Sequence, residues 1–180
     1  MAKLILAMNV SADGYVDDAA GGLVMPPPGP ELFDYWTRHV RDLSGSLYGR
    51  RMYETMRYWD GDDPDWSPAF RAFAEAWRRL PKWVVSSTLT EVGPNATLIT
   101  GDIEAQVRAL KKRGRGTISV AGPQIAGRMT KAGLIDEYHL YVLPYVLGGG
   151  KAVFHDTAPK LRFLASEQVA EAVHLAYAGG

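Results

Sequence analysis

The residues from Ile118 to Ala132 combine a short apolar run, a Gly122-Pro123 break and a helical pattern. The unpaired amides and the positive dipole end of a helix attract anions, and glycine lets a ligand approach the backbone closely. This arrangement of strand, turn and helix predicts a site for the pyrophosphate of a dinucleotide. Gly133 stands where a helix commonly ends in a left-handed residue.

Two further segments place polar side chains where a predicted strand ends. Gly49, Arg50 and Arg51 stand between a strand and a helix, and two guanidinium groups there could grip a phosphate, although solvated surface arginines explain them equally well. Ser86, Ser87 and Thr88 could bind a ribose or a phosphate, but hydroxyl groups at strand ends are often ordinary turn chemistry. Open α/β sheets bind ligands at the carboxyl ends of their strands. The presence of three such sites therefore favours ligand binding over ordinary turn or surface roles.

Candidate proton donors are few. Glu31 and Asp34 are three residues apart and share one face of a predicted helix, and Asp13 stands in a turn. His39 falls on the apolar stripe of that helix, which favours a hydrogen-bonded packing histidine. The four histidines lack the spacing of metal ligands, so no metal is expected.

Other candidates have alternatives that stay open. Asp136 and Glu137 are neighbours on a predicted strand and point to opposite faces, which favours structural roles. The Gly148–Gly150 run fits a phosphate cradle or a sharp turn equally well. Five aromatic residues could form a wall for a flat heterocycle or could simply pack in the core; they are Trp36, Tyr53, Tyr58, Trp59 and Trp66.

The elements that position these residues alternate between strand and helix. This alternation predicts an α/β sheet that is largely parallel, and two final strands without a helix between them predict an antiparallel end. Ser11 to Pro30 is rich in turn-forming residues and reads as a long functional loop. The expected strands are 3–9, 46–48, 83–86, 98–99, 118–121, 136–143, 161–169 and 173–177, and the expected helices are 31–43, 52–59, 67–80, 102–113 and 123–132.

Composition narrows the class of protein. The 180 residues fit one domain, 1–180, with 20 basic and 20 acidic side chains, so no net field attracts nucleic acid. The chain has no cysteine, which excludes disulfides and thiolate chemistry and fits a reducing, cytoplasmic location. No segment reaches the ~18 apolar residues of a membrane helix, so a membrane is not an expected partner. The balanced charge likewise makes nucleic acid an unexpected partner.

The order of the motifs resembles the dihydrofolate reductase-like superfamily, in the branch of the riboflavin-biosynthesis deaminase-reductases and their stand-alone relatives. The resemblance spans nearly the whole chain and depends on the order of the motifs more than on any one of them. The segments that carry it are MxxSxDGY (from Met8), LYGRRMYE (47–54), VVSSTL (84–89), VAGPQIA (120–126), GLIDEYHLYVLPYVLGGG (133–150) and VF (153–154).

The resemblance implies a three-layer α/β fold with a mostly parallel eight-stranded central sheet, flanking helices, NADPH as the hydride donor and a homodimer. Arg50 and Arg51 would meet the 2′-phosphate and the pyrophosphate, with Ser86 and Ser87 near the 2′-phosphate. Ala7 and Gly14 would lie beside the nicotinamide, and Ser11–Met25 would be a mobile flap. The residues that would wrap the pyrophosphate are Ala121, Gly122, Pro123, Gln124 and Ile125.

This chain departs from the family pattern in two places. Ala121 and Pro123 stand where glycines are usual, and Pro123 has no amide to offer a phosphate. The carboxylate that folate reductases place on the first helix would fall near Leu32 or Phe33, so dihydrofolate reduction is not expected. The resemblance therefore implies an NADPH-dependent reductase of another small heterocycle, with 5-amino-6-(5-phosphoribosylamino)uracil as the named candidate. A non-catalytic nucleotide-binding protein, acting as a sensor or an interaction module, is the alternative.

Overall fold

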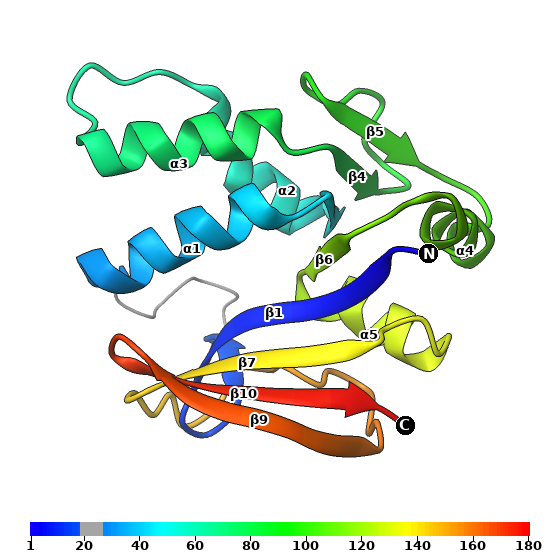
Figure 1. The fold of residues 1–180 in the computed structure, drawn as a ribbon. Coiled ribbons are helices and arrows are strands. Elements are labelled where there is room, and N and C mark those ends of the chain that lie inside the picture. The colour runs from blue at the N-terminus through cyan, green and yellow to red at the C-terminus, as the bar shows by residue number, and fades with distance from the viewer. Residues whose placement is uncertain (19–26) are drawn as a thin grey trace.

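The computed structural model describes residues 1–18 and 27–180 and is built on one eight-stranded sheet (Figure 1). The strand order is β5-β4-β3-β6-β1-β7-β10-β9, and every neighbouring pair is parallel except those that involve β10. The predicted mostly parallel sheet with an antiparallel C-terminal end is therefore confirmed. The eight strands are β1 (Lys3–Ser11), β3 (Gly45–Gly49), β4 (Lys82–Val85), β5 (Ala96–Ile99), β6 (Thr117–Ala121), β7 (Glu137–Leu143), β9 (Leu161–Val169) and β10 (Ala172–Gly179).

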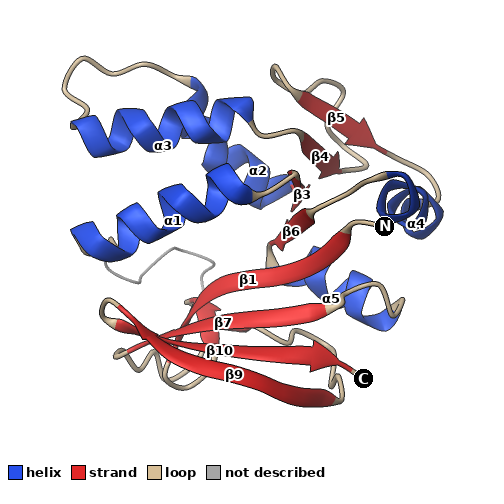
Figure 2. Ribbon diagram, in the orientation of Figure 1, coloured by secondary structure: helices blue, strands red, loops and turns tan. Residues whose placement is uncertain are grey.

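Helices cover both faces of the sheet, which gives the three layers (Figure 2). One face carries α1 (Pro30–Asp42), α2 (Arg50–Met56), the 3₁₀ turn η1 (Arg57–Asp60) and α3 (Pro68–Arg79). The other face carries α4 (Ile103–Arg113) and α5 (Pro123–Lys131). Among the described residues, no helix is long and apolar enough to cross a membrane.

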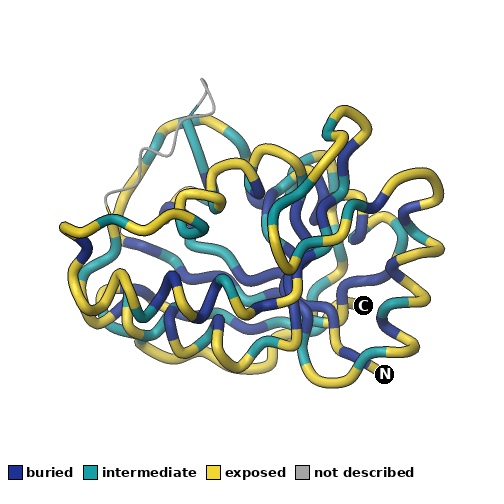
Figure 3. Tube along the Cα trace, turned by 90° about the horizontal axis from the view of Figure 1, so that it is seen from above, coloured by how far each residue is buried: buried dark blue, intermediate teal, exposed yellow. Residues whose placement is uncertain are grey.

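The alternating side chains of β1 explain how one strand serves two layers. Leu4 and Leu6 pack in the core under α4 and α5, while Ile5 and Ala7 pack on the α1 side. A strand buried on both faces reads as a continuous apolar run, as this one does. Figure 3 shows the buried segments running through the middle of the molecule.

Helix ends follow local chemistry. The side chain of Ser67 caps α3 by accepting from the Phe70 amide at 3.2 Å, and Asp102 caps α4 by accepting from the Ala105 amide at 3.0 Å. Gly133 follows α5 with a φ of +64°, as predicted for a left-handed residue past a helix end. The second predicted helix begins earlier than expected, at Arg50, and changes to a 3₁₀ turn at Arg57.

The loop predicted over Ser11–Pro30 contains a strand, which the turn-rich composition concealed. β2 (Tyr15–Asp17) pairs antiparallel with β8 (Lys151–Ala152), more than 130 residues away. Gly150 has a φ of +129°, and a Cβ there would lie 2.0 Å from the Asp17 carbonyl oxygen. The glycine run therefore makes a sharp turn beside β2.

His39 differs from the prediction of a hydrogen-bonded packing histidine. Its Nε2 atom is buried and meets no hydrogen-bond partner in the described part of the chain. Burial lowers the pKa of His39 from 6.5 to about 4, because the imidazolium form cannot be solvated there.

This lowered pKa predicts acid sensitivity. The unfolded chain takes up a proton at His39 as the pH falls below 6.5 while the folded chain resists until about 4, so folding stability falls across that window. At about 1.4 kcal/mol per pH unit, His39 alone costs roughly 3 kcal/mol. In chemical denaturation at pH 7 and pH 4.5, His39→Leu should lose clearly less stability than the wild type. Equal losses in both proteins would exclude His39 as the source.

Candidate functional site

The carboxyl ends of β3, β4 and β6 bring together the three predicted ligand segments. Gly49 pairs with Val85, the residue before Ser86, and Tyr48 pairs with Ala121. β3 lies between the other two strands in the sheet. The segments around residues 49–51, 86–88 and 121–125 therefore form one continuous edge, although they are far apart in the sequence.

Arg50 and Arg51 open helix α2, and both side chains are exposed. A guanidinium nitrogen of Arg50 lies 3.2 Å from a carboxylate oxygen of Glu54, one turn along the same helix. Such an exposed pair is weak and can exchange its partner for a phosphate at little cost. Gly49, the N-cap residue of α2, packs near Ile125 of α5.

Ser86 and Ser87 follow β4 and differ in their roles. Ser86 is buried, and its hydroxyl oxygen accepts from the amides of Thr88 and Leu89 at 3.1 and 3.0 Å. This hydroxyl therefore shapes the turn. Ser87 is exposed and is free in this geometry to face a ligand.

The turn between β6 and α5 is tight, as its sequence predicts. Gly122 has a φ of +110°, a conformation that L side chains rarely adopt, and it is the N-cap residue of α5. Pro123 occupies the first turn of the helix, where its missing amide removes one possible donor. Ala121 ends the strand, Gln124 is exposed and Ile125 is buried.

A second group of side chains lies on the α1 side of β1. Ala7 is buried and shares a core cluster with Leu32 of α1. Two residues along β1, the Asn9 side-chain oxygen accepts from the indole N–H of Trp36 at 3.2 Å. The ring of Trp36 also meets Tyr141 edge-on, with centroids 4.7 Å apart. An amide and aromatic rings beside Ala7 suit a flat heterocycle.

Sequence reasoning missed Asn9 and Tyr141 as site residues. Asn9 could have been found, because it is a polar residue on a buried strand and shares the face of Ala7 two positions earlier. The pairing of Tyr141 with the Tyr35 hydroxyl, at 2.5 Å between the oxygens, required knowledge of how α1 lies on the sheet.

Asp13 is held in a network of donors. One carboxylate oxygen accepts from the Ser11 hydroxyl at 2.6 Å and from the Leu147 amide at 3.1 Å, and the other accepts from the Gly148 amide at 2.8 Å. The Ser11 hydroxyl and these amides lower the pKa of Asp13 below its ordinary value. A carboxylate that stays ionised is a hydrogen-bond acceptor, and here it fastens the residues before β2 to the glycine turn. Gly14, with a φ of +87°, follows in the same turn.

Glu31 and Asp34 lie on the solvent side of α1. Asp34 forms an ion pair with Arg38 one turn later, and Glu31 stands in the first turn of the helix. The structure does not bring either acid together with the segments at 49–51, 86–88 and 121–125.

The predicted flap, Ser11–Met25, is described only as far as residue 18; its remainder lies outside the described residues.

The five aromatic residues mostly pack with one another. Trp59 lies within 5.5 Å, centroid to centroid, of both Trp66 and Phe73, and Tyr53 is buried in the cluster between α2, α3 and β4.

Asp136 is structural, since one of its oxygens accepts from the Leu4 amide at 2.7 Å and pairs with Lys111 at 2.7 Å. A separate hollow of about 620 Å³ lies between α4 and α5 and touches the predicted site only at Gln124.

The whole chain resembles one known protein family. The model of the RibD C-terminal domain matches residues 2–175. The chain belongs to the RibD C-terminal domain family. At the level of that family it is an oxidoreductase, and its fold is that of the dihydrofolate reductase-like proteins.

Similar proteins agree with this membership. The uncharacterized protein YyaP of Bacillus subtilis (strain 168) is 27% identical over 165 residues, which cover 88% of this chain and 84% of that protein. A putative riboflavin biosynthesis protein from Shewanella sp. PV-4 has a TM-score of 0.75 at 23% identity and covers 100% and 99% of the two chains. Dihydrofolate reductase from Enterococcus faecalis, in complex with NADP(H), has a TM-score of 0.65 at 13% identity and covers 99% and 96%.

Proposed function

We propose that this chain is an NADPH-dependent reductase of a small heterocyclic substrate, related to 5-amino-6-(5-phosphoribosylamino)uracil. One observation carries the proposal: arginines, hydroxyl groups and a glycine turn meet at the adjacent carboxyl ends of β3, β4 and β6 in a member of the RibD C-terminal domain family. Open α/β sheets bind nucleotides at this edge.

The residues present fit a dinucleotide. Arg50 and Arg51, with Ser87, would hold the 2′-phosphate of the adenosine, and the turn 121–125 would hold the pyrophosphate. The backbone at Gly122 suits a close approach, because this residue has no Cβ and adopts a φ of +110°. Ala7 and Gly14 would border the nicotinamide, which supplies the hydride when it is bound.

The chain's own contribution is to bind, orient and exclude water. Asn9 and Trp36 lie on the Ala7 side and would orient a flat ring by hydrogen bonding and stacking. We assign Asp13 a positioning role, because its carboxylate is already occupied by three donors. Of the acids, Asp34 is engaged by Arg38. Glu31 lies on the solvent side of α1 and would supply the proton through water.

Steady-state consumption of NADPH with pterin, flavin-precursor and quinone acceptors tests this proposal. A reductase oxidises NADPH only when the correct acceptor is present. The alternative, a nucleotide-binding protein without turnover, is favoured by Pro123 in the phosphate turn and by the outward-facing Glu31 and Asp34. Tight NADPH binding without consumption for any acceptor would support that alternative.

We also propose that the protein forms a homodimer through edge strand β9. Residues 162–168 are all exposed, and the strand ends the sheet with Phe163 58% and Leu164 39% exposed. A long exposed edge strand offers unpaired backbone groups to which a second chain can pair. Arg162 and Glu167 stand near opposite ends of the strand, so a second copy running antiparallel would place opposite charges near one another.

Replacement of the exposed aromatic residue of this edge tests the dimer. In sedimentation velocity at micromolar concentration, Phe163→Lys should convert a dimer into a monomer, because the new charge would be buried at the interface. Phe70→Lys, which changes an exposed aromatic residue on α3, should leave the dimer intact. A monomeric wild type, or a Phe163→Lys protein that stays dimeric, would place the interface elsewhere or remove it. A single domain and a cytoplasmic location accompany this proposal as predictions.

A further inference from the structure

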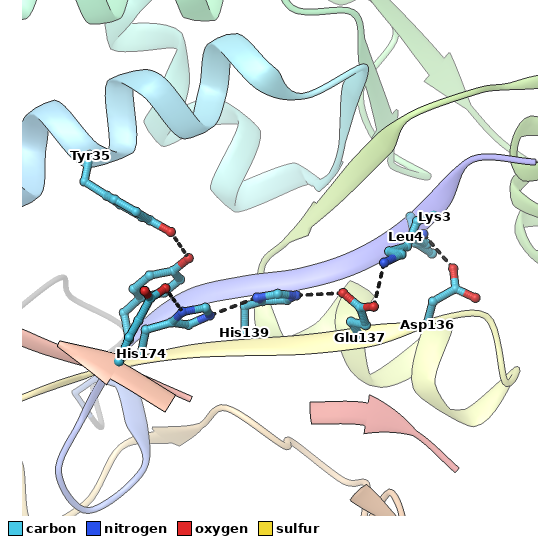
Figure 4. A network of polar contacts seen from close by, with 9 residues as sticks. Lys3, Leu4, Tyr35, Asp136, Glu137, His139 and His174 are labelled. Carbon is cyan, nitrogen blue, oxygen red and sulfur yellow. Dashed lines mark hydrogen bonds and ion pairs between the residues drawn. The ribbon is translucent and has the colours of Figure 1, made fainter. Parts of the chain in front are cut away.

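Two histidines and two glutamates form one line across the α1 side of the sheet (Figure 4). His139 of β7 and His174 of β10 face one another, with Nδ1 of the first 2.9 Å from Nε2 of the second. His139 Nε2 lies 3.1 Å from Glu137, and His174 Nδ1 lies 3.1 Å from Glu167 of β9. The line therefore connects the edge strand with a central strand.

The number of protons in this line follows from its three contacts. Each contact needs one ring N–H, because carboxylates accept only and two bare ring nitrogens cannot bond to one another. Two neutral imidazoles carry two N–H groups in total, so one contact must be lost. Three N–H groups satisfy all three contacts, and a fourth would set two donors against each other at 2.9 Å.

The surroundings indicate which ring carries the additional proton. Burial lowers the pKa of His139, so this ring is the neutral one, donating from Nε2 to Glu137 and accepting at Nδ1. Although burial opposes it, the bonds from Lys3 and His139 hold the pKa of Glu137 below its usual range. His174 then donates from both nitrogens, and its ring stacks on Tyr141 at 4.6 Å with only 7° between the planes. A cation over an aromatic face is stabilised.

We propose that the His139–His174 pair holds one additional proton, carried by His174, and forms a proton-dependent clasp, which fastens edge strand β9 to central strand β7 and stacks on Tyr141 below α1. With the proton, both glutamates are bonded. Without it, the contact between His174 and Glu167 is lost. The clasp is a property of the fold and does not depend on the proposed reductase activity.

Every charged or titratable group around the pair fits this assignment. His39 of α1 is kept neutral by burial and does not compete for the proton. The Tyr35 and Tyr141 hydroxyl groups bond to one another, and burial raises the pKa of Tyr141, so Tyr141 carries no charge. The groups that face the pair are Lys3 of β1, Glu137 and Tyr141 of β7, Glu167 of β9, and Tyr35 and His39 of α1.

Histidine side-chain NMR of the full ¹⁵N-labelled chain tests the clasp. Near pH 6.5, His139 should show a neutral ring protonated at Nε2, and His174 should show two protonated nitrogens. Glu167→Gln removes the charge that favours the third proton, so fewer molecules at this pH should show His174 with both nitrogens protonated. Glu167 is largely exposed, so this variant should fold.

Glu91→Gln is the matched control, because it also removes one exposed negative charge. Glu91 lies between β4 and β5, and β5 is at the opposite edge of the sheet from β9. This variant should leave the side-chain signals of both histidines unchanged. Four results would overturn the proton-dependent clasp: two neutral rings near pH 6.5, two charged rings, a His139 ring protonated at Nδ1, or the same His174 protonation in the wild type and Glu167→Gln.

Discussion

Arg50→Ala should raise the Kd for NADPH about 10- to 100-fold while the Kd for NADH changes little. A charge-assisted hydrogen bond to a phosphate contributes roughly 1.5–3 kcal/mol, which corresponds to that range of affinity. Only NADPH carries the 2′-phosphate, so the loss should be confined to it. Arg50 is exposed at the start of α2 and has only a weak pair with Glu54 to give up. Isothermal calorimetry measures both constants.

Arg113→Ala provides the control for this result. Arg113 is an exposed arginine at the end of α4, where its charge complements the negative end of the helix dipole, away from the edge formed by β3, β4 and β6. This variant should bind both cofactors as the wild type does. If Arg50→Ala weakens NADPH and NADH by the same factor, Arg50 does not contact the 2′-phosphate.

Asp13→Asn should accelerate amide hydrogen exchange several-fold at one of two residues, Leu147 or Gly148. The wild-type carboxylate accepts from both amides and from Ser11, whereas an asparagine presents one oxygen and one donating NH₂ group. One amide therefore loses its acceptor and opens to water more often. Exchange followed by NMR or mass spectrometry resolves this turn from the rest of the chain.

The same variant separates a positioning role from a proton-donating role. As a positioning residue, Asp13 should affect turnover without changing the shape of the pH profile, since its carboxylate stays ionised in the working range. Asp65→Asn, an exposed aspartate in the turn before α3, should change neither exchange nor turnover. Unchanged exchange at Leu147 and Gly148, together with the loss of one limb of the pH profile, would restore Asp13 as the acid.

Local chemistry explains what the sequence could predict. Ser67 followed by Pro68 specifies a helix start without contacts from distant residues. Gly122 followed by Pro123 specifies a turn into a helix in the same way. Strand ends could therefore be located, and the parallel sheet then brings residues 49–51, 86–88 and 121–125 to one edge. The family membership agrees with the order of these motifs.

Contacts between distant segments explain what could not be predicted. β2 exists because Tyr15 pairs with Ala152, and a three-residue strand leaves almost no periodic signal. The orientation of α1 decides that Glu31 and Asp34 face solvent while Tyr35 and Trp36 face the sheet. The His139–His174 contact depends on the register between β7 and β10, in which Tyr141 is opposite His174 and His139 is opposite Ala176.

We propose above all that the edge formed by β3, β4 and β6 binds NADPH. The most direct test is a calorimetric titration of the purified protein with NADPH and, separately, with NADH. We predict one NADPH site per chain and at least tenfold weaker binding of NADH, since the arginines at this edge would meet the 2′-phosphate. Binding of neither nucleotide, or equal binding of both, would contradict the claim.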